Sequence, residues 1–254
     1  MGCMKSKQTI ENEFGKFFYT PTYIKYKNQL FNYRQRIRMI HKTLEKHSDI
    51  MAREYNIADI GSGISPVTPD ISKTVFIELE KQAVDFLRKQ GLNAVKGDIT
   101  HLSFQKESFD AILCSEVLEH VPNYKKGISE MARVLKKNGL VIITVPIHQK
   151  YWKDDDEFVG HCRRFDPETL AKDIKASGLQ IVERKPIGSR LERWLTWNIV
   201  KIARRKGNKE MNANKVKLFA FYAINTLLLQ FIKIAAALTS EENSSIILFA
   251  AKKN

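Results

Sequence analysis

The chain has 254 residues, of which 43% are hydrophobic, and this size suits one folded domain with additions or two small domains. Cys3, Cys114 and Cys162 are too few and too widely spaced for a disulfide framework or a metal-type cysteine pair, which favours a reducing, cytoplasmic compartment. Residues 1–12 are polar and lack the apolar segment of a secretory signal.

The formal net charge of +14 lies at the two ends of the chain. Residues 1–50 carry +6 and residues 186–254 carry +8, whereas the positive and negative residues between them cancel. Basic ends predict an anionic partner, which is a nucleic acid, a membrane surface or a phosphorylated substrate.

A helix is predicted over residues 22–47, because aromatic and aliphatic residues recur there every three or four positions. From Asn56 onwards, strand-like and helix-like runs alternate, which predicts a mostly parallel sheet covered on both faces. Ligands of such a sheet bind at the carboxyl ends of its strands. The predicted strands are residues 57–60, 74–77, 93–96, 109–114, 140–145 and 179–184, and the predicted helices are residues 80–90, 124–137 and 167–177.

The texture changes after Gly188. Residues 190–206 and 215–238 are predicted to be helices that are both basic and apolar, and residues 245–251 return to a strand pattern. We therefore divide the chain into a basic N-terminal helix region (1–50), an α/β core (51–188), a helical insertion (189–243) and a final strand (244–254).

Polar residues and glycines stand where the predicted strands end. Glycine lets the backbone approach a ligand closely, and a doubly wound fold places an acid after its second strand against ribose hydroxyls. The third glycine of the dinucleotide-binding pattern is missing, and Pro66 stands in its place, which disfavours a pyrophosphate ligand. In order of the strands, the residues are Asp59, Gly61, Ser62 and Gly63, then Glu78 and Leu79, then Asp98 and Ile99, then Ser115 and Glu116.

Two segments together resemble the class I S-adenosylmethionine-dependent methyltransferases. They are "IADIGSG" and the stretch from Gly97 to Pro146, which includes "SFDAILCSEVLEHVPNYKKGISEMARVLKKNGLVIITVP", and the resemblance covers roughly residues 55–187. It is similar to the methyltransferase type 11 group and to enzymes of lipid, glycan and quinone pathways. The resemblance implies a Rossmann-like, seven-stranded sheet with an antiparallel last strand, which "SSIILFAAKK" fits.

The resemblance also implies roles for the residues at the strand ends. The loop from Asp59 to Gly63 holds the methionine part of S-adenosylmethionine, and Ser115 and Glu116 lie beside it. Glu78, followed by Leu79, accepts from the ribose hydroxyls. Asp98 accepts from the adenine amine, with Ile99 at the ring edge; ionised carboxylates suit these donors because they only accept. Little room remains for the helix that normally follows the glycine loop, because "ISPVTPDISKT" contains two prolines.

Methyl transfer to a hydroxyl needs a base with a pKa near neutrality, and His148 and His161 are the candidates. His120 in "LEHVP" is interpreted as structural. The segment after the fifth strand is expected to cover the site, with Tyr151, Trp152, Arg163 and Arg164 as substrate or lid residues; a salt-bridged loop that caps the following helix is the alternative. The acidic run 154–157 with His161 could ligate a divalent ion, but such runs are usually solvated, and we predict no metal.

The segment Leu218–Leu238 is long enough to span a bilayer, but its four polar residues fall within one arc and leave a broad apolar face. One crossing would also separate the final strand from its sheet. We therefore predict a helix lying in the membrane interface, with a helical lid or a dimer contact as the alternatives. Trp194, Trp197, Arg204 and Arg205 are expected at the headgroups, and Leu228 and Phe231 on the apolar face. Gly2 and Cys3 also fit a lipidation pattern.

These observations predict an enzyme that methylates oxygen on a small-molecule, lipid, quinone-like or lipid-linked glycan acceptor, as a peripheral protein on an anionic membrane surface. An RNA or protein methyltransferase that docks through the basic ends is one alternative, and a non-catalytic cofactor-binding protein is another. Nucleic acid is disfavoured, because no added RNA-binding module is recognisable and the fourth strand ends in Cys-Ser-Glu-Val.

Overall fold

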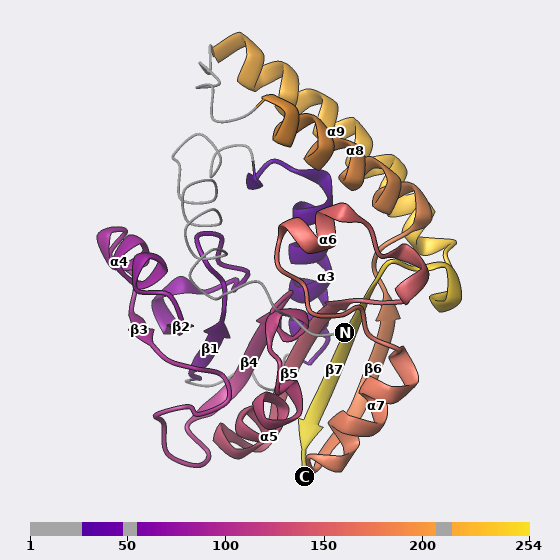
Figure 1. Cartoon of the computed structure of the whole chain (residues 1–254). Helices are drawn as coiled ribbons and strands as arrows, with labels where there is room; N and C mark the ends of the chain where they lie inside the picture. Colours follow the sequence, from indigo (N-terminus) through magenta and orange to yellow (C-terminus); the bar gives the residue numbers. More distant parts are fainter. Residues whose placement is uncertain (1–26, 48–54, 207–214) are drawn as a thin grey trace.

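The computed structural model describes residues 27–47, 55–206 and 215–254 (Figure 1). A seven-stranded sheet in the order β3-β2-β1-β4-β5-β7-β6 forms its centre. β7 is antiparallel to β5 and to β6, and the other neighbours are parallel, so the predicted topology is confirmed. The strands are β1 (Ile57–Ile60), β2 (Thr74–Glu78), β3 (Ala94–Lys96), β4 (Phe109–Ser115), β5 (Leu135–Pro146), β6 (Leu179–Pro186) and β7 (Ile246–Lys253).

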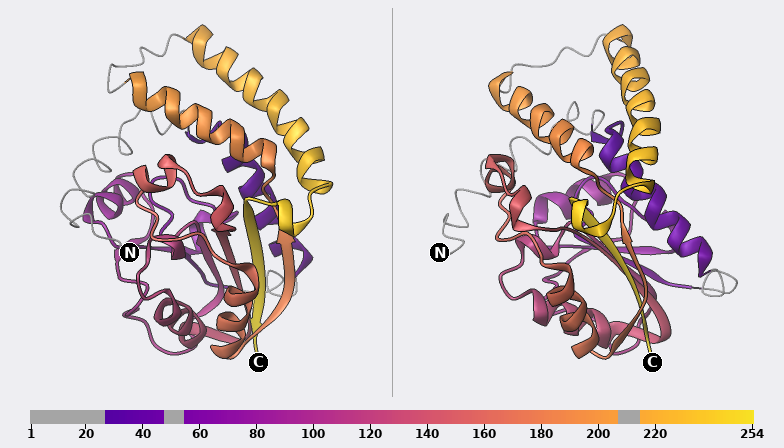
Figure 2. Two further views of the ribbon diagram at one scale, coloured as in Figure 1. Left: turned by 45° about the vertical axis from the view of Figure 1, so that its right-hand side comes forward. Right: turned by 90° about the vertical axis from the view of Figure 1, so that its right-hand side faces the viewer.

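The central strands are continuous apolar runs because both faces of the sheet are covered. α3 (Phe31–Lys46) and α4 (Lys81–Lys89) cover one face, and α5 (Tyr124–Val134) and α7 (Pro167–Ala176) cover the other (Figure 2). The basic N-terminal helix therefore contributes to the core: Ile40 and Leu44 of α3 pack in one cluster with residues of β1, β4, β5 and β7.

The structure confirms the predicted start of α7 and the absence of an α-helix between β1 and β2, but α5 ends earlier than predicted. The carboxylate of Asp166 accepts from the backbone of Thr169 and caps α7, whose first residue is Pro167. The β1–β2 connection holds only a short 3-10 turn, η1 (Ile71–Lys73), in place of an α-helix. However, α5 ends at Val134, three residues earlier than predicted, because Leu135 already pairs with Phe109 in the sheet.

Three helices lie beyond the carboxyl edge of the parallel strands: α6 (Asp154–Phe158), α8 (Arg190–Lys206) and α9 (Lys215–Ala237) (Figure 1). The helices predicted at 190–206 and 215–238 are thereby confirmed. α9 packs along α3, where Leu229 and Ile232 bury the side chain of Phe31. The lipidation pattern at Gly2 and Cys3 lies outside the described residues, as do the side chains of Arg204 and Arg205.

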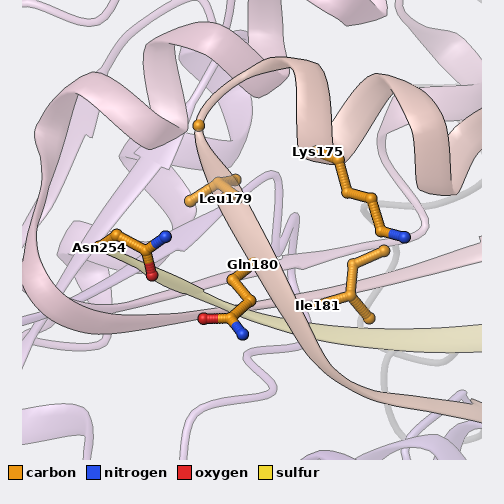
Figure 3. Close-up of a pocket in the computed structure, with 6 residues that line it drawn as sticks. Lys175, Leu179, Gln180, Ile181 and Asn254 are labelled. Atoms are coloured by element: carbon orange, nitrogen blue, oxygen red, sulfur yellow. The ribbon is translucent and has the colours of Figure 1, made fainter.

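A pocket of about 460 Å³ opens at the opposite edge of the sheet, between the start of β6 and the end of the chain (Figure 3). Its lining includes one charged side chain, that of Lys175. Because ligands of this fold bind at the carboxyl edge, and because the glycine loop lies there, this pocket is not the candidate active site.

Candidate active site

The glycine loop after β1 folds back onto Glu78 at the end of β2. Gly61 and Gly63 both have positive φ angles, +71° and +61°. A Cβ on Gly61 would lie 2.5 Å from a methyl group of Val117, so this position requires glycine, whereas no described atom lies within 4 Å of a Cβ on Gly63. The backbone N–H of Gly63 and the hydroxyl of Ser62 donate to Oε1 of Glu78 at 2.7 and 2.9 Å. The loop therefore holds Glu78 at the rim of an open space.

Two buried carboxyl groups lie under and beside this loop. Burial is the main cause that raises the pKa of Glu78 to about 7 and that of Asp59 to about 7. Oδ2 of Asp59 accepts from the backbone of Val67 at 3.0 Å, and its Oδ1 has no hydrogen-bond partner among the described residues. Asp59 is completely buried, so it fastens the segment that follows the loop.

The end of β3 continues the same edge. The backbone N–H of Gly97 donates to the carbonyl of Glu78 at 2.9 Å, which brings Asp98 next to β2. Asp98 is exposed, and its Oδ1 accepts from the backbone and the hydroxyl of Thr100, both at 2.8 Å. Ile99 is buried against Gly127, whereas the side chain of Leu79 is half-exposed. The predicted acids after β2 and β3 thus lie side by side.

The end of β4 brings a charged residue of α3 into the site. Glu116 has a φ of +56°, which is uncommon for a residue other than glycine. Its Oε1 accepts from the hydroxyl of Thr144 at 3.3 Å, and its Oε2 lies 3.5 Å from Nη1 of Arg36. Nε of Arg36 is buried and has no hydrogen-bond partner among the described residues. The hydroxyl of Ser115 also contacts that of Thr144, at 2.9 Å.

A second cluster follows directly along the chain. Nδ1 of His161 lies 2.7 Å from Oδ1 of Asp156, and its Nε2 lies 3.7 Å from Oε1 of Glu119. Burial would raise the pKa of Asp156, but the hydrogen bond from His161 and the charge of Arg164 lower it to about 2. Because the ionised carboxylate only accepts, Nδ1 of His161 carries a proton, and Nε2 faces Glu119.

The family of methyltransferase domains matches residues 58–143, which include the loop, all four strand ends and Glu119. The chain carries a class I S-adenosylmethionine-dependent methyltransferase domain. An uncharacterized methyltransferase of Bacillus subtilis is 30% identical over 129 residues, which are 45% of this chain and 49% of that protein. The 2-methyl-6-phytyl-1,4-hydroquinone methyltransferase 2 of rice is 28% identical over 153 residues, which are 56% and 43% of the two chains. The chain thus spans about half the length of these relatives.

A solved structure shares the fold of this methyltransferase domain. It is phosphoethanolamine N-methyltransferase 2 of Haemonchus contortus in complex with S-adenosylmethionine, with a TM-score of 0.59 and 18% identity. The match covers 96% of this chain and 60% of that one.

The strand ends of the methyltransferase domain fit S-adenosylmethionine. The hydrogen bonds between described residues engage only Oε1 of Glu78 and only Oδ1 of Asp98, so each acid keeps an oxygen for the donors of the cofactor. The cofactor also carries a carboxylate, and the unpaired Nε of Arg36 is a buried cationic donor. No described atom lies within 4 Å of a Cβ placed on Gly63, so the glycine loop leaves space beside it.

The segment over the methyltransferase site is held by its own polar contacts. Nε2 of His148 lies 2.9 Å from the carbonyl of Glu241, and the hydroxyl of Tyr151 donates to the carbonyl of Asn243 at 3.1 Å. These contacts attach His148 and Tyr151 to the segment before β7, and they do not bring His148 to His161. The indole of Trp152 is half-buried and lies 3.5 Å from Glu157.

Both predicted arginines bind backbone carbonyl groups. Arg163 donates to Val121 and to the next residue, and its guanidinium lies 4.9 Å from the ring centre of Tyr124. Arg164 is buried and donates to Ile147 and Ser245. These contacts favour the alternative of a loop that the arginines hold in place. Nε of Arg164 is buried and has no hydrogen-bond partner among the described residues.

Buried ion pairs join this loop to the helical insertion. The guanidinium of Arg193 on α8 binds Asp155 and Asp156 of α6 at 2.5–2.9 Å. Nε1 of Trp197 donates to Asp154 at 2.7 Å, so this indole lies against α6 in contrast to the expected headgroup position. Three of the four acids in the run 154–157 thereby contact α8.

Sequence reasoning missed Arg36 and Glu119. Arg36 was one of several basic residues on a helix with an evident apolar face, and nothing in the pattern distinguishes it. Glu119 stood next to a histidine that was interpreted as structural, although two adjacent titratable residues after a strand end are a recognisable signal.

Proposed function

We propose that the chain transfers the methyl group of S-adenosylmethionine to a hydroxyl oxygen of a lipid, quinone-like or lipid-linked glycan acceptor at an anionic membrane surface. The observation that carries the membrane part is an outward apolar stripe on α9, the helix that follows α8 and its ion pairs with the loop over the site. The proposed cofactor contacts follow from the strand ends: Glu78 for the ribose, Asp98 for the adenine amine, and Arg36 with the glycine loop for the methionine end.

Transfer from a sulfonium is an in-line displacement, in which the protein aligns the two reactants and excludes water. We propose that His161 activates the acceptor hydroxyl. Asp156 holds its Nδ1–H, so Nε2 presents a lone pair on the side of Glu119, one turn after the end of β4. The acceptor oxygen then forms a bond to the methyl carbon, and the electron pair of the carbon–sulfur bond stays on sulfur.

The stripe on α9 has helical spacing and faces away from the protein. Ile224, Leu227, Phe231, Ile234 and Leu238 are all more than half exposed, at steps of three and four residues. The most apolar 18-residue window, Ala220–Ala237, has a mean hydropathy of 1.5 and is only 22% buried. Exposed apolar area of this kind marks an interaction site.

Two polar contacts support a helix that lies on the membrane and does not cross it. Asn225 accepts from the backbone of Phe31, and Thr226 accepts from Arg34 at 2.9 Å. Asn225 and Thr226 therefore face α3, as do the buried Leu229 and Ile232, and the stripe faces outward. β7 follows α9 after a few residues and lies in the central sheet, so a crossing would separate it from its neighbours.

Charge and the comparisons support the same acceptor class. Residues 186–254 carry +8, and each basic residue near an anionic surface contributes about 1 kcal/mol of attraction. Trp194 on α8 is 55% exposed, which suits an indole at headgroup depth. The rice relative is named for a phytyl hydroquinone, which is an amphiphilic acceptor.

Methyl transfer from labelled S-adenosylmethionine to separate acceptor pools tests the proposal. With membrane lipid extract, total RNA and a protein extract offered in parallel, we expect label in the lipid fraction, and none with the Glu78→Ala variant. Label in RNA or protein would instead assign the second class of acceptor. Cofactor binding without label in any pool would indicate a non-catalytic protein.

A further inference from the structure

Glu119 is a buried carboxyl group that no hydrogen bond from the described residues satisfies. Its side chain is completely buried, and neither Oε1 nor Oε2 has a hydrogen-bond partner among the described residues. Burying a carboxyl group without a partner is costly, so such a group points to a ligand that is bound at this place. Its backbone carbonyl is engaged with the N–H of Cys162, which fixes the position of the residue.

Two imidazole rings lie beside this carboxyl group. Glu119, His120 and His161 each offer one ligand atom, and the three atoms lie within 4.8 Å of one another. The rings of His120 and His161 have their centres 4.8 Å apart, at an angle of 72°. Two donors on one tetrahedral zinc ion lie about 3.4 Å apart, given bonds of about 2.0–2.1 Å, and Glu119 Oε1 is already 3.7 Å from His161 Nε2. The separations of the three ligand atoms, at most 4.8 Å, exceed this distance by at most about 1.4 Å, which is the adjustment that binding of one ion requires.

Both histidines are held in the tautomer that a metal requires. Nδ1 of His120 lies 3.2 Å from the carbonyl of Gly160, and Nδ1 of His161 lies 2.7 Å from Asp156. A carbonyl and an ionised carboxylate only accept, so each Nδ1 carries the proton, and each Nε2 carries the lone pair. Metal-binding histidines in proteins are oriented by such contacts of the second nitrogen with carboxylates and backbone carbonyls.

We propose that Glu119, His120 and His161 bind a divalent transition-metal ion, with zinc as the best match. Two imidazoles and one carboxylate are a set found in catalytic zinc sites, which keep a fourth position open. His120 and His161 are only partly buried, which leaves access for a fourth ligand.

The role of the metal ion in activating the acceptor hydroxyl rests on the proposed function. The lone pair of His161 then holds the ion, and the ion, in place of the bare imidazole, activates the acceptor hydroxyl in the fourth position. The hydroxyl proton passes to solvent water, the oxygen forms the bond to the methyl carbon, and the carbon–sulfur pair leaves with sulfur. The binding of the ion itself does not depend on the identity of the acceptor.

Calorimetry of the chelator-treated full chain with Zn²⁺ tests the site. We expect one ion per chain, and a loss of more than about 100-fold in affinity in each of the variants Glu119→Gln, His120→Ala and His161→Ala, because even outer contacts such as that of Asp156 are worth about 10–100-fold. His101→Ala, which removes an exposed histidine outside the cluster, is the matched control and should bind zinc as the unmodified chain does. S-adenosylmethionine affinity, measured on the same samples, reports whether each variant is folded.

The outcomes separate this inference from the proposed function. An unmodified chain that takes up no stoichiometric Zn²⁺, or folded Glu119→Gln and His161→Ala variants with unchanged zinc affinity, would overturn the site. Tetrahedral absorption bands on addition of Co²⁺ give a second readout that depends on the ligands alone. Lipid methylation at an undiminished rate after chelation would overturn the activating role and leave the proposed function intact. Zinc binding without lipid methylation would leave the metal site intact and overturn the proposed function.

Discussion

Nδ1 of His161 and Oδ1 of Asp156 lie 2.7 Å apart, and this contact connects the chemistry of the site to the helical insertion. The same carboxylate of Asp156 also binds Arg193 on α8 at 2.9 Å. One acid therefore orients the histidine and fixes the helix that precedes α9.

Replacement of His161 by Ala should reduce methyl transfer by about 10²–10⁴-fold, because the group that activates the hydroxyl is lost. S-adenosylmethionine affinity should stay unchanged, since His161 lies outside the predicted cofactor contacts. His148→Ala is the comparison: its Nε2 is engaged with Glu241, so we expect a smaller loss. Turnover with one lipid acceptor and cofactor affinity, measured for both variants, show which histidine activates the hydroxyl. Near-normal turnover of His161→Ala would contradict the assignment of this role to His161.

The carboxylates at the ends of β2 and β3, buried Glu78 and exposed Asp98, should dominate cofactor binding. Glu78→Ala and Asp98→Ala should each weaken S-adenosylmethionine binding by about 1.5–3 kcal/mol, the range for hydrogen bonds to charged groups. Glu80→Ala, which removes an exposed acid two residues from Glu78, is the matched control. If calorimetry finds all three variants equal to the unmodified chain, the cofactor does not bind at these strand ends.

Cofactor affinity should fall as the pH decreases through about 7. Burial raises the pKa of Glu78 to about 7 in the free protein, and only the ionised form accepts from both ribose hydroxyls. Below that pKa, binding must first remove a proton, so the dissociation constant should rise by up to tenfold for each pH unit. Calorimetry between pH 5.5 and 8.5 measures this slope. A Glu78→Gln variant should bind weakly with a flatter profile, and an equal slope in that variant would assign the titration to another group.

Removal of the Arg193 guanidinium should strongly destabilise the protein. Arg193→Met leaves Asp155 buried without its guanidinium partner and removes one of the two guanidinium partners of Asp156, and broken buried pairs cost about 3–5 kcal/mol in the free energy of unfolding. Lys81→Met, which removes the exposed pair with Asp85, should cost less than about 1 kcal/mol. Urea unfolding compares the two variants, and equal losses would show that the contacts between α6 and α8 do not stabilise the fold.

The apolar stripe on α9 should govern attachment to membranes. Leu227→Glu combined with Phe231→Glu should abolish sedimentation with anionic vesicles, because both side chains are 64% exposed, and should leave S-adenosylmethionine affinity intact. Leu228, predicted for the same face, packs toward the cluster around Phe31, so its substitution would also disturb the fold. Ile71→Glu combined with Val182→Glu places the same charges on exposed apolar residues elsewhere and should not affect sedimentation.

High salt should release the unmodified chain from vesicles only in part, because salt screens charge and does not weaken apolar burial. Complete release would mean a purely electrostatic contact and would favour nucleic acid. If the double variant on α9 unfolds, the stripe belongs to a packed interface, and the membrane proposal fails.

Most of the sheet could be predicted from the sequence, because each strand is an apolar run that ends in glycine or polar residues, and this pattern is visible within one short segment. Glu78 and Asp98 could be placed at one edge because parallel strands end on the same side. The loop over the site was predicted less well: α6 is only five residues long, and its acids are held by Arg193, which is 37 residues further along the chain than Asp156. No local pattern carries such a pairing.

The cluster around Glu119 was beyond sequence reasoning for the same reason. His120 and His161 are far apart in the chain, and their rings come together only because the loop folds back over η2 (Leu118–His120). Arg36 reaches Glu116 from a helix whose other basic residues look the same in the sequence. Periodicity predicted an apolar face on α9 that includes Phe231, but it could not show that Leu228 packs toward α3.

Transfer of labelled methyl groups into anionic vesicles that contain membrane lipid extract tests the central claim most directly. The unmodified chain should label the lipid fraction, and the chain with Leu227→Glu and Phe231→Glu should label it far more slowly while binding S-adenosylmethionine equally well. Label that appears only in RNA or protein, or equal labelling of lipid by the two chains, would contradict a methyltransferase that works at the membrane surface.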